Sequence, residues 1–215
     1  MATIMVDFDS TLCPFESLEI VCEHCGRLDL ITEFKRYCKL AMAGQMTFED
    51  SIRRRFAMFQ PHKDILKAVG EKLSTQLTSG FPEAIQTMKE AGHTVFVVSG
   101  GLKDLITHAV APHSIVSEDI FALSITYDEQ GHLSSVIEDG FHIGKPHGLR
   151  KLNQQWEGPI IIIGDGTNDL ELKTHKFVDY FIAYTEHEHR PQVVKEADYV
   201  AGNTEKLISH LLEIL

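Results

Sequence analysis

Carboxylate side chains gather at two places in the sequence where a run of β-branched apolar residues ends. Asp7 and Asp9 follow the first such run, and Asp165 and Asp169 follow a later one, on either side of a glycine turn. Neighbouring carboxylates repel one another unless a positive group binds between them. Oxygen ligands suit Mg²⁺, which proteins usually bind through few carboxylates. The pattern therefore predicts a divalent-metal site, although the first pair alone also fits a solvated acidic loop.

A second set of residues could bind the oxygens of a phosphate. Ser99, Gly100 and Gly101 follow another apolar run and precede a predicted helix, whose free N–H groups and dipole favour an anion. Lys145 stands just before a further predicted helix, and Asn168 lies in the later acidic turn. Each feature alone fits a plain turn or a solvated lysine. Together with the carboxylates, they predict an Mg²⁺-dependent site of phosphoryl transfer.

The elements that must position these residues alternate along the chain. Short β-branched or aromatic runs predict strands buried on both faces at residues 3–6, 94–98, 160–163 and 177–183. Amphipathic patterns predict helices at residues 81–91, 102–110, 147–155, 170–175, 190–197 and 204–215. This alternation predicts an α/β fold with a doubly wound parallel sheet. In such sheets, ligands bind outside the carboxyl ends of the strands.

Two segments interrupt the alternation. Residues 14–78 show helical periodicity, and we expect four helices there, near 15–25, 28–43, 47–58 and 62–77. We therefore expect a helical cap subdomain over 14–78, inserted into an α/β core made of residues 1–13 and 79–215. Apolar and polar residues partly alternate over 120–137, on both sides of a turn at 128–131, which predicts a β-hairpin.

Composition and charge limit the class of protein. The 215 residues carry 31 acidic and 20 basic side chains, a formal net charge of −11. Because no basic patch could neutralise phosphates, we expect no binding to nucleic acid, and the charge also argues against docking on an anionic membrane. No apolar run reaches the roughly 18 residues of a membrane span, and the N-terminus is unlike a signal peptide. We therefore expect a cytoplasmic protein with reduced cysteines, and monomer or homodimer stays open.

Four motifs, in this order, resemble those of the haloacid dehalogenase (HAD) superfamily of phosphatases. They read Asp7-Phe-Asp9-Ser-Thr11-Leu, Val-Val-Ser99-Gly100-Gly101, Gly-Lys145-Pro and Gly-Asp165-Gly-Thr-Asn168-Asp169. Within that superfamily the chain is most similar to the phosphoserine phosphatase family, through its first motif and its predicted cap. The resemblance implies a HAD-like, Rossmann-like core with an inserted cap. It also implies an Mg²⁺ cofactor and a small phosphorylated metabolite as substrate, with phosphoserine as the first expectation.

The resemblance also implies a role for each residue of the core site. Asp7 would be the nucleophile that forms an aspartyl-phosphate, and Asp9 the general acid and base, its pKa raised by burial or neighbouring charge. The metal ligands would be Asp7, the backbone carbonyl of Asp9, and Asp165. The groups that bind or support the phosphoryl group would be Ser99, Gly100, Gly101, Lys145 and Asn168, with Thr11 and Asp169 in supporting positions.

Four residues of the predicted cap stand where the family contacts the amino-acid part of its substrate. Glu16 would bind the ammonium group, and Arg55 would pair with the carboxylate through its planar guanidinium. Met42 and Phe48 would form the core of the cap and contact the substrate secondarily. Glu16 could instead stabilise a helix N-terminus, and one of the two arginines before Arg55 could take its role.

Two other functions stay open from the sequence. The first is a related phosphatase or phosphotransferase for another small metabolite, which an outward-facing Arg55 or Glu16 would favour. The second is a non-catalytic interaction or zinc-binding module. The run Cys22-Glu-His24-Cys25 lacks the second ligand pair of a structural zinc site, however, and His187 with its neighbours fits a solvated loop better than a metal site.

Overall fold

The computed structural model describes residues 1–42, 45–152 and 154–215, and the side chain of Met42 lies outside the described part. The first half of the chain contains β1 (Thr3–Val6), α1 (Ser17–His24), α2 (Leu28–Met42), α3 (Phe48–Met58), α4 (Lys63–Leu73), α5 (Phe81–Glu90), β2 (Thr94–Leu102) and α6 (Lys103–Val110). The second half contains β3 (Ile120–Leu123), β4 (Ile125–Tyr127), β5 (Leu133–Val136), α7 (Lys145–Lys151), β6 (Ile160–Gly164), α8 (Thr167–Thr174), β7 (Tyr180–Tyr184), α9 (Pro191–Glu196), β8 (Tyr199–Ala201) and α10 (Thr204–Ile214).

The central sheet is parallel, which confirms the predicted doubly wound α/β fold. Within the described chain its strand order is β3-β2-β1-β6-β7-β8, so the order reverses between β1 and β6. Val6 pairs in register with Val97 of β2 and with Ile163 of β6. The residues that follow these strands therefore emerge side by side, at the switch point where open α/β sheets bind ligands.

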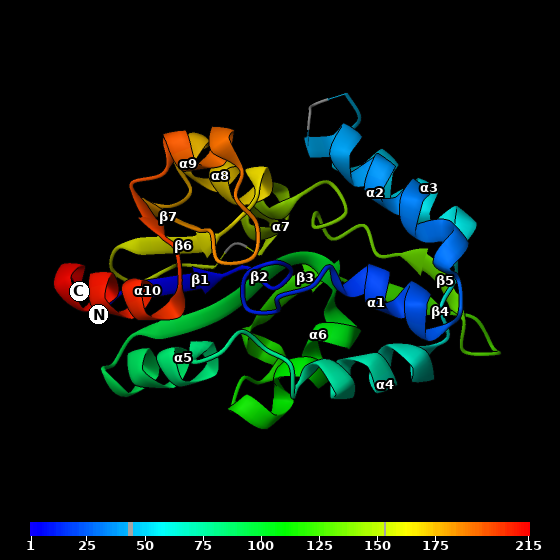
Figure 1. The fold of residues 1–215 in the computed structure, drawn as a ribbon, viewed down its shortest axis with the longest axis horizontal. Coiled ribbons are helices and arrows are strands. Elements are labelled where there is room, and N and C mark those ends of the chain that lie inside the picture. The colour runs from blue at the N-terminus through cyan, green and yellow to red at the C-terminus, as the bar shows by residue number, and fades with distance from the viewer. Residues whose placement is uncertain (43–44, 153) are drawn as a thin grey trace.

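Successive strand residues point to opposite faces of the sheet and meet two helical layers. Ile4 and Val6 belong to a core cluster shared with α5, α6 and α10, whereas Met5 belongs to a second cluster shared with α7, α8 and α9. Figure 1 shows these two layers on opposite sides of the strands. The sheet is thus buried on both faces, as its near-continuous apolar strands predict.

Several element boundaries differ from the prediction. The structure extends β2 through Ser99, Gly100 and Gly101 to Leu102, where we expected a turn. After a shift in register beyond Val98, Leu102 pairs with Leu123 of β3. Helix α7 begins at Lys145 and ends earlier than predicted, and α4 ends at Leu73. The expected hairpin is formed by β4 and β5, whereas β3 joins the main sheet beside β2. Strand β8 carried no prediction.

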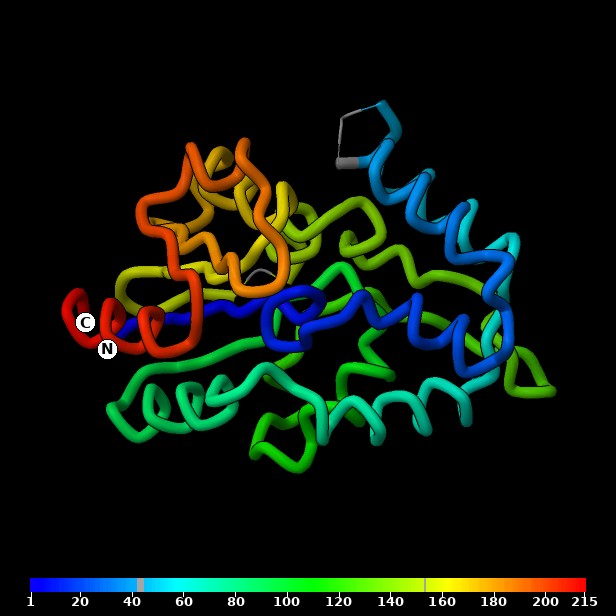
Figure 2. The backbone as a smooth tube through the Cα atoms, in the orientation of Figure 1, coloured from blue at the N-terminus to red at the C-terminus, as the bar shows by residue number. Residues whose placement is uncertain are grey.

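The four helices expected in segment 14–78 are all present. Figure 2 shows α1 and α2 beyond the carboxyl ends of the strands, on the side away from the two chain termini. Helix α4 instead packs closely on α6. A Cβ added at Gly70 would lie 2.5 Å from the backbone oxygen of Leu105, so a larger side chain would force the two helices apart. The division into a core and a cap stays a prediction.

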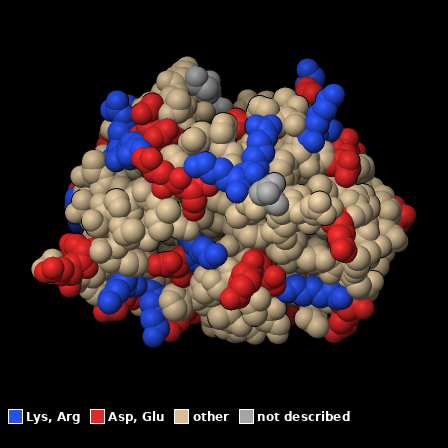
Figure 3. Space-filling model, turned by 180° about the vertical axis from the view of Figure 1, so that it is seen from behind, with Lys and Arg blue, Asp and Glu red and all other residues tan. Residues whose placement is uncertain are grey.

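The described surface carries both signs of charge. Figure 3 shows acidic and basic side chains interspersed over one face of the molecule.

The four cysteines are free thiols. Among the residues that the structure describes, no helix combines the length and the apolar composition that a bilayer span requires.

Candidate active site

The loop after β1 is built to hold two carboxylates at the edge of the sheet. Phe8 and Leu12 are fully buried and anchor the loop in the core. Backbone hydrogen bonds close it, from the Leu12 N–H to the Asp7 carbonyl (3.3 Å) and from the Cys13 N–H to the Phe8 carbonyl (2.7 Å). Ser10 adopts φ of 54° at the apex of the turn. Anchoring Phe8 in the core leaves the flanking Asp7 and Asp9 at the sheet edge.

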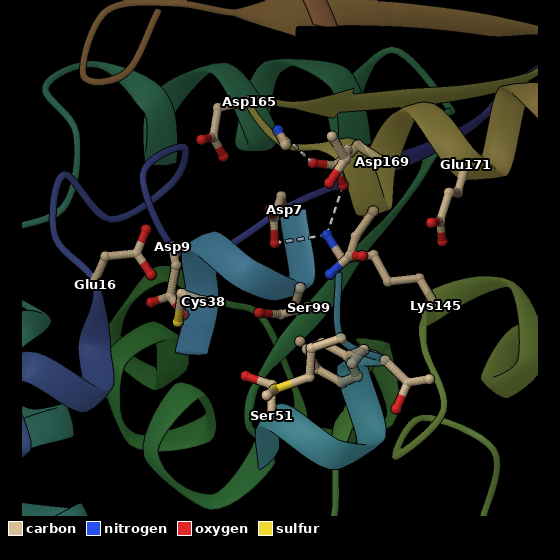
Figure 4. A pocket seen from close by; sticks show the side chains of 18 of the residues that line it. Asp7, Asp9, Glu16, Cys38, Ser51, Ser99, Lys145, Asp165, Asp169 and Glu171 are labelled. Atoms are coloured by element: carbon tan, nitrogen blue, oxygen red, sulfur yellow. Dashed lines mark hydrogen bonds and ion pairs between the residues drawn. The ribbon is translucent and has the colours of Figure 1, made fainter. Parts of the chain in front are cut away.

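A buried lysine joins the carboxylates of two strand ends. The Lys145 Nζ lies 2.8 Å from Asp7 Oδ1 and 2.6 Å from Asp169 Oδ1, as drawn in Figure 4. Asp7 Oδ1 also accepts a hydrogen bond from the Phe8 N–H at 2.7 Å. Burial disfavours the charged lysine, but Asp169 and Asp7 outweigh that effect and raise the pKa of Lys145 above its ordinary value. Lys145 is therefore a permanent positive charge beside Asp7.

Asp7, Asp165 and Asp169 form the cluster of possible metal ligands in the described chain. Their ligand atoms lie within 4.8 Å of one another. Burial and the charge of Asp7 raise the pKa of Asp165 to about 8 and that of Asp169 to about 7. The raised values come first from burial and then from repulsion between the carboxylates, which Lys145 and Arg190 offset only in part. Such an all-oxygen donor set fits a small divalent cation.

The position of Asp169 depends on the end of β6. Its Oδ2 accepts a hydrogen bond from the Gly166 N–H at 3.1 Å. A Cβ added at Gly164 would lie 2.2 Å from the Asp169 Cγ, so only glycine leaves room for this carboxylate. Thr11, fully buried, donates a long hydrogen bond of 3.5 Å to Asp165 Oδ1. The turn and the Thr11 loop thus orient both carboxylates.

Asp9 has the properties of a proton donor near neutral pH. Burial, then the charges of Glu16 and Asp7, raise the pKa of Asp9 to about 8, which confirms the predicted direction. Its Oδ1 accepts the Ser17 N–H at 2.9 Å, so the proton belongs on Oδ2. A Cβ added at Gly101 would lie 3.2 Å from that Oδ2. Asp9 is therefore fixed at Oδ1 by the first residue of α1, while its Oδ2 lies close to Gly101 of β2.

One cavity of about 250 Å³ brings these core residues together with segment 14–78. From the core it is lined by Asp7, Asp9, Ser99, Gly100, Lys145, Asp165, Asn168 and Asp169. From segment 14–78 it is lined by Glu16, Cys38, Phe48, Ser51 and Arg55, among others. Figure 4 shows the labelled acids and Lys145 on one side and Ser51 on the other. Met42 lies at the end of α2, and its side chain is outside the described residues.

The predicted phosphate-binding residues lie where segment 14–78 approaches β2. The buried Ser99 Oγ accepts the Gly101 N–H at 3.0 Å. A Cβ added at Gly100 would lie 3.1 Å from the Phe48 ring and 3.9 Å from Asn168 Nδ2. The absence of a side chain at Gly100 thus lets Phe48 and Asn168 approach β2, and the Phe48 ring lines the cavity next to Gly100.

The two predicted cap charges face the cavity. Glu16 Oε1 accepts a hydrogen bond from Ser10 Oγ at 2.8 Å, and burial raises the pKa of Glu16. Arg55 is buried, with 7% of its surface exposed. The two arginines before it have other partners. Arg53 pairs with Glu49 and Glu138, and the exposed Arg54 lies over the Tyr37 ring. Arg55 is therefore the arginine of α3 that lines the site.

Arg190 is a site residue that the sequence analysis missed. Its Nη2 lies 2.7 Å from Asp165 Oδ2, its Nε donates to the same oxygen at 3.0 Å, and it lines the cavity. It follows β7, whose carboxyl end lies at the same edge of the sheet as those of β1 and β6. The expected strand before Arg190 could have indicated that this arginine lies near the same edge of the sheet. The unusual sequence of residues 185–189 made it unclear where Arg190 would lie.

The histidine and cysteine motifs contribute no further metal cluster among the described residues. His187 Nε2 lies 2.8 Å from Thr78 Oγ1, which itself donates to the Thr11 carbonyl at 2.6 Å. Burial lowers the pKa of His187, consistent with a neutral ring in this contact. Cys22, His24 and Cys25 are not among the described side chains that lie close enough together to bind a metal ion. His187 thus has a structural contact behind the active-site loop.

The raised carboxyl pKa values predict how stability responds to pH. Asp9 and Asp165 titrate near pH 8 in the folded chain, against an ordinary value of 3.8. Between about pH 3.8 and pH 8, the folded chain binds more protons than the unfolded chain, so the free energy of unfolding falls as pH rises. In EDTA, urea unfolding should show lower stability at about pH 8.5 than at about pH 5.5, and added Mg²⁺ should restore more stability at the higher pH. Stability that is flat or rises over this range would contradict the electrostatics described for the cluster.

Comparison with known proteins agrees with the fold. The haloacid dehalogenase-like hydrolase family matches residues 4–172. Phosphoserine phosphatase of Mus musculus is 27% identical over 217 residues, covering 98% of this chain and 93% of that protein. The chloroplastic phosphoserine phosphatase of Arabidopsis thaliana is 26% identical over 213 residues, covering 97% and 71%. The crystal structure of a phosphoserine phosphohydrolase-like protein from Francisella tularensis superposes with a TM-score of 0.91 at 32% identity, covering 98% of this chain and 100% of that one. Since the family match spans most of the chain, this protein belongs to the haloacid dehalogenase-like hydrolases.

Proposed function

We propose that the protein hydrolyses O-phospho-L-serine to L-serine and phosphate, with Mg²⁺ as cofactor. One observation carries the proposal: a single cavity joins the cluster around Asp7 to Glu16 and Arg55, a negative and a positive side chain suited to an amino acid. Relatives that match nearly the whole of this chain and are named phosphoserine phosphatase support the same substrate. Residues 14–78 act as the cap that supplies these two charges.

In the first half-reaction, Asp7 attacks phosphorus and the bond between phosphorus and the serine oxygen breaks. The Phe8 N–H and Lys145 hold Asp7 Oδ1 and so orient the carboxylate for in-line attack. Asp9, protonated near neutral pH, gives its Oδ2 proton to the departing serine oxygen. The products of this step are serine and an aspartyl-phosphate on Asp7.

In the second half-reaction, Asp9 takes a proton from water, whose oxygen attacks phosphorus as the bond to Asp7 breaks. Free phosphate leaves, and both carboxyl groups return to their starting states. Ser99, the Gly100 N–H, Lys145 and Asn168 bind the phosphoryl oxygens, where charge develops in both transition states. Bound by Asp7, the Asp9 carbonyl and Asp165, with Asp169 holding Lys145, Mg²⁺ would screen the repulsion between Asp7 and the phosphate dianion.

The experiment that tests this function compares small phosphate esters. With Mg²⁺ present, kcat/KM should be highest for L-phosphoserine, and much lower for phosphoethanolamine and 3-phosphonooxypropanoate, which lack the carboxylate and the ammonium group respectively. Equal values for the three esters would reject phosphoserine as the substrate. Faster transfer to an added alcohol than to water would favour a phosphotransferase.

Replacing Arg55 by methionine should remove the preference for a carboxylate. We expect kcat/KM for L-phosphoserine to fall roughly 100-fold, because a planar guanidinium bound to a carboxylate contributes strongly in a buried site. The value for phosphoethanolamine should change little. The matched control is Arg54→Met on the same helix, since Arg54 is exposed. If both variants lose activity alike on both esters, Arg55 does not bind the carboxylate.

A further inference from the structure

Ser51 presents a buried hydroxyl to the cavity without using it in the fold. The residue has 0% of its surface exposed, it lines the cavity, and its Oγ has no hydrogen-bond partner among the described residues. Helical serines commonly bond back to the carbonyl four residues earlier. Here the Thr47 carbonyl accepts the Ser51 N–H at 3.1 Å, and the hydroxyl takes no part. A buried hydroxyl left unpaired costs folding free energy, so a ligand that pairs it would gain from the contact.

The neighbourhood of Ser51 indicates which ligand group that would be. Arg55 lies four residues later on α3, on the same helix face, and its Nε donates to the Ser51 carbonyl at 3.3 Å. This bond draws the guanidinium back over the turn that contains Ser51. The two side chains therefore present N–H and O–H donors to one region of the cavity. Figure 4 places Ser51 across the cavity from Asp7, on the side away from the carboxylate cluster.

We propose that the Ser51 hydroxyl donates a hydrogen bond to the carboxylate of the substrate, beside Arg55. Ser51 then contributes to the selection of phosphoserine over phosphate esters that lack a carboxylate. This inference rests on the proposed function, because it names a further contact in the same site. It also accounts for a buried hydroxyl that has no hydrogen-bond partner among the residues that the structure describes.

The test is the Ser51→Ala variant, assayed on L-phosphoserine and on phosphoethanolamine, with unfolding in urea measured in parallel. The stability of S51A should equal or exceed that of the wild type, because the variant loses an unpaired buried group. Its KM for phosphoserine should rise about tenfold with kcat nearly unchanged, which is the effect of losing one hydrogen bond to a charged group. Its KM for phosphoethanolamine should stay the same. Ser51→Cys, with a weaker donor of similar shape, should fall between the two.

The outcomes separate this inference from the function on which it rests. If the wild type does not prefer phosphoserine, the proposed function fails first. If the wild type prefers phosphoserine and S51A keeps the full preference, the Ser51 contact is wrong. Equal losses on both esters, or a large loss of stability in S51A, would show that Ser51 supports the fold and would overturn the inference.

Discussion

Replacing Asp7 by asparagine is expected to abolish the release of phosphate from L-phosphoserine, with kcat at least roughly 10⁴-fold lower than in the wild type. An amide oxygen cannot form a stable acyl phosphate, so the variant lacks the nucleophile. The fold should persist, because the amide oxygen of the new side chain can still accept from the Phe8 N–H, and Lys145 keeps its pair with Asp169. Steady-state phosphate release and urea unfolding measure the two effects.

The matched control for this variant is Asp50→Asn, which changes an exposed aspartate on α3. It should keep wild-type turnover and wild-type stability. An Asp7→Asn variant with a tenth of the wild-type kcat or more would mean that another group attacks phosphorus. In that case Asp9, the other carboxylate of the same loop, would be the first alternative.

Replacing Lys145 by methionine should damage both activity and stability. The wild-type lysine, with 2% of its side chain exposed, pairs with two buried carboxylates, and removing one partner of a buried ion pair typically costs about 3–5 kcal/mol. Asp7 and Asp169 would then lie beside each other without a cation, and the pKa of Asp169, already raised to about 7, should rise further. The loss should therefore be smaller at about pH 5 than at about pH 8, because protonation neutralises Asp169 in the folded chain.

The free energy of unfolding of K145M, measured in urea at both pH values, tests this expectation. Turnover should fall to the background rate even where the variant is folded, since Lys145 would also bind a phosphoryl oxygen. The control is Lys151→Met at the end of the same helix, an exposed lysine that donates to the Glu138 carbonyl. Equal stability of K145M and the wild type at both pH values would contradict the buried cluster.

The sequence predicts the centre of this molecule well because that centre consists of strand ends. Three consecutive apolar runs, each followed by acidic or small residues, were enough to expect Asp7, Ser99 and Asp165 at one edge. The two outer strands were predicted less well: the residues of β3 were expected in a β-hairpin, and β8 was not predicted. Each pairs with a single neighbour in the sheet, and for a short edge strand that neighbour is set by tertiary packing rather than by the local pattern.

Side-chain partners were harder to foresee than positions. Nothing in the local pattern around Arg190 indicates a pair with Asp165, because that contact spans 25 residues and depends on the path of the loop after β7. The choice of Arg55 among three consecutive arginines likewise depends on helix phase and on what covers α3. The unpaired Ser51 hydroxyl is visible only once the packing around it is known.

The central claim is that the phosphoryl group passes through Asp7, and trapping that intermediate tests it most directly. The wild-type protein, mixed with radiolabelled L-phosphoserine and Mg²⁺, would be quenched with acid within a turnover and treated with borohydride. Borohydride reduces an acyl phosphate to an alcohol, so mass spectrometry should find homoserine at position 7 and unchanged aspartate at position 9. Homoserine at a position other than 7, or rapid release of phosphate with no labelled protein before reduction at any time, would contradict the account.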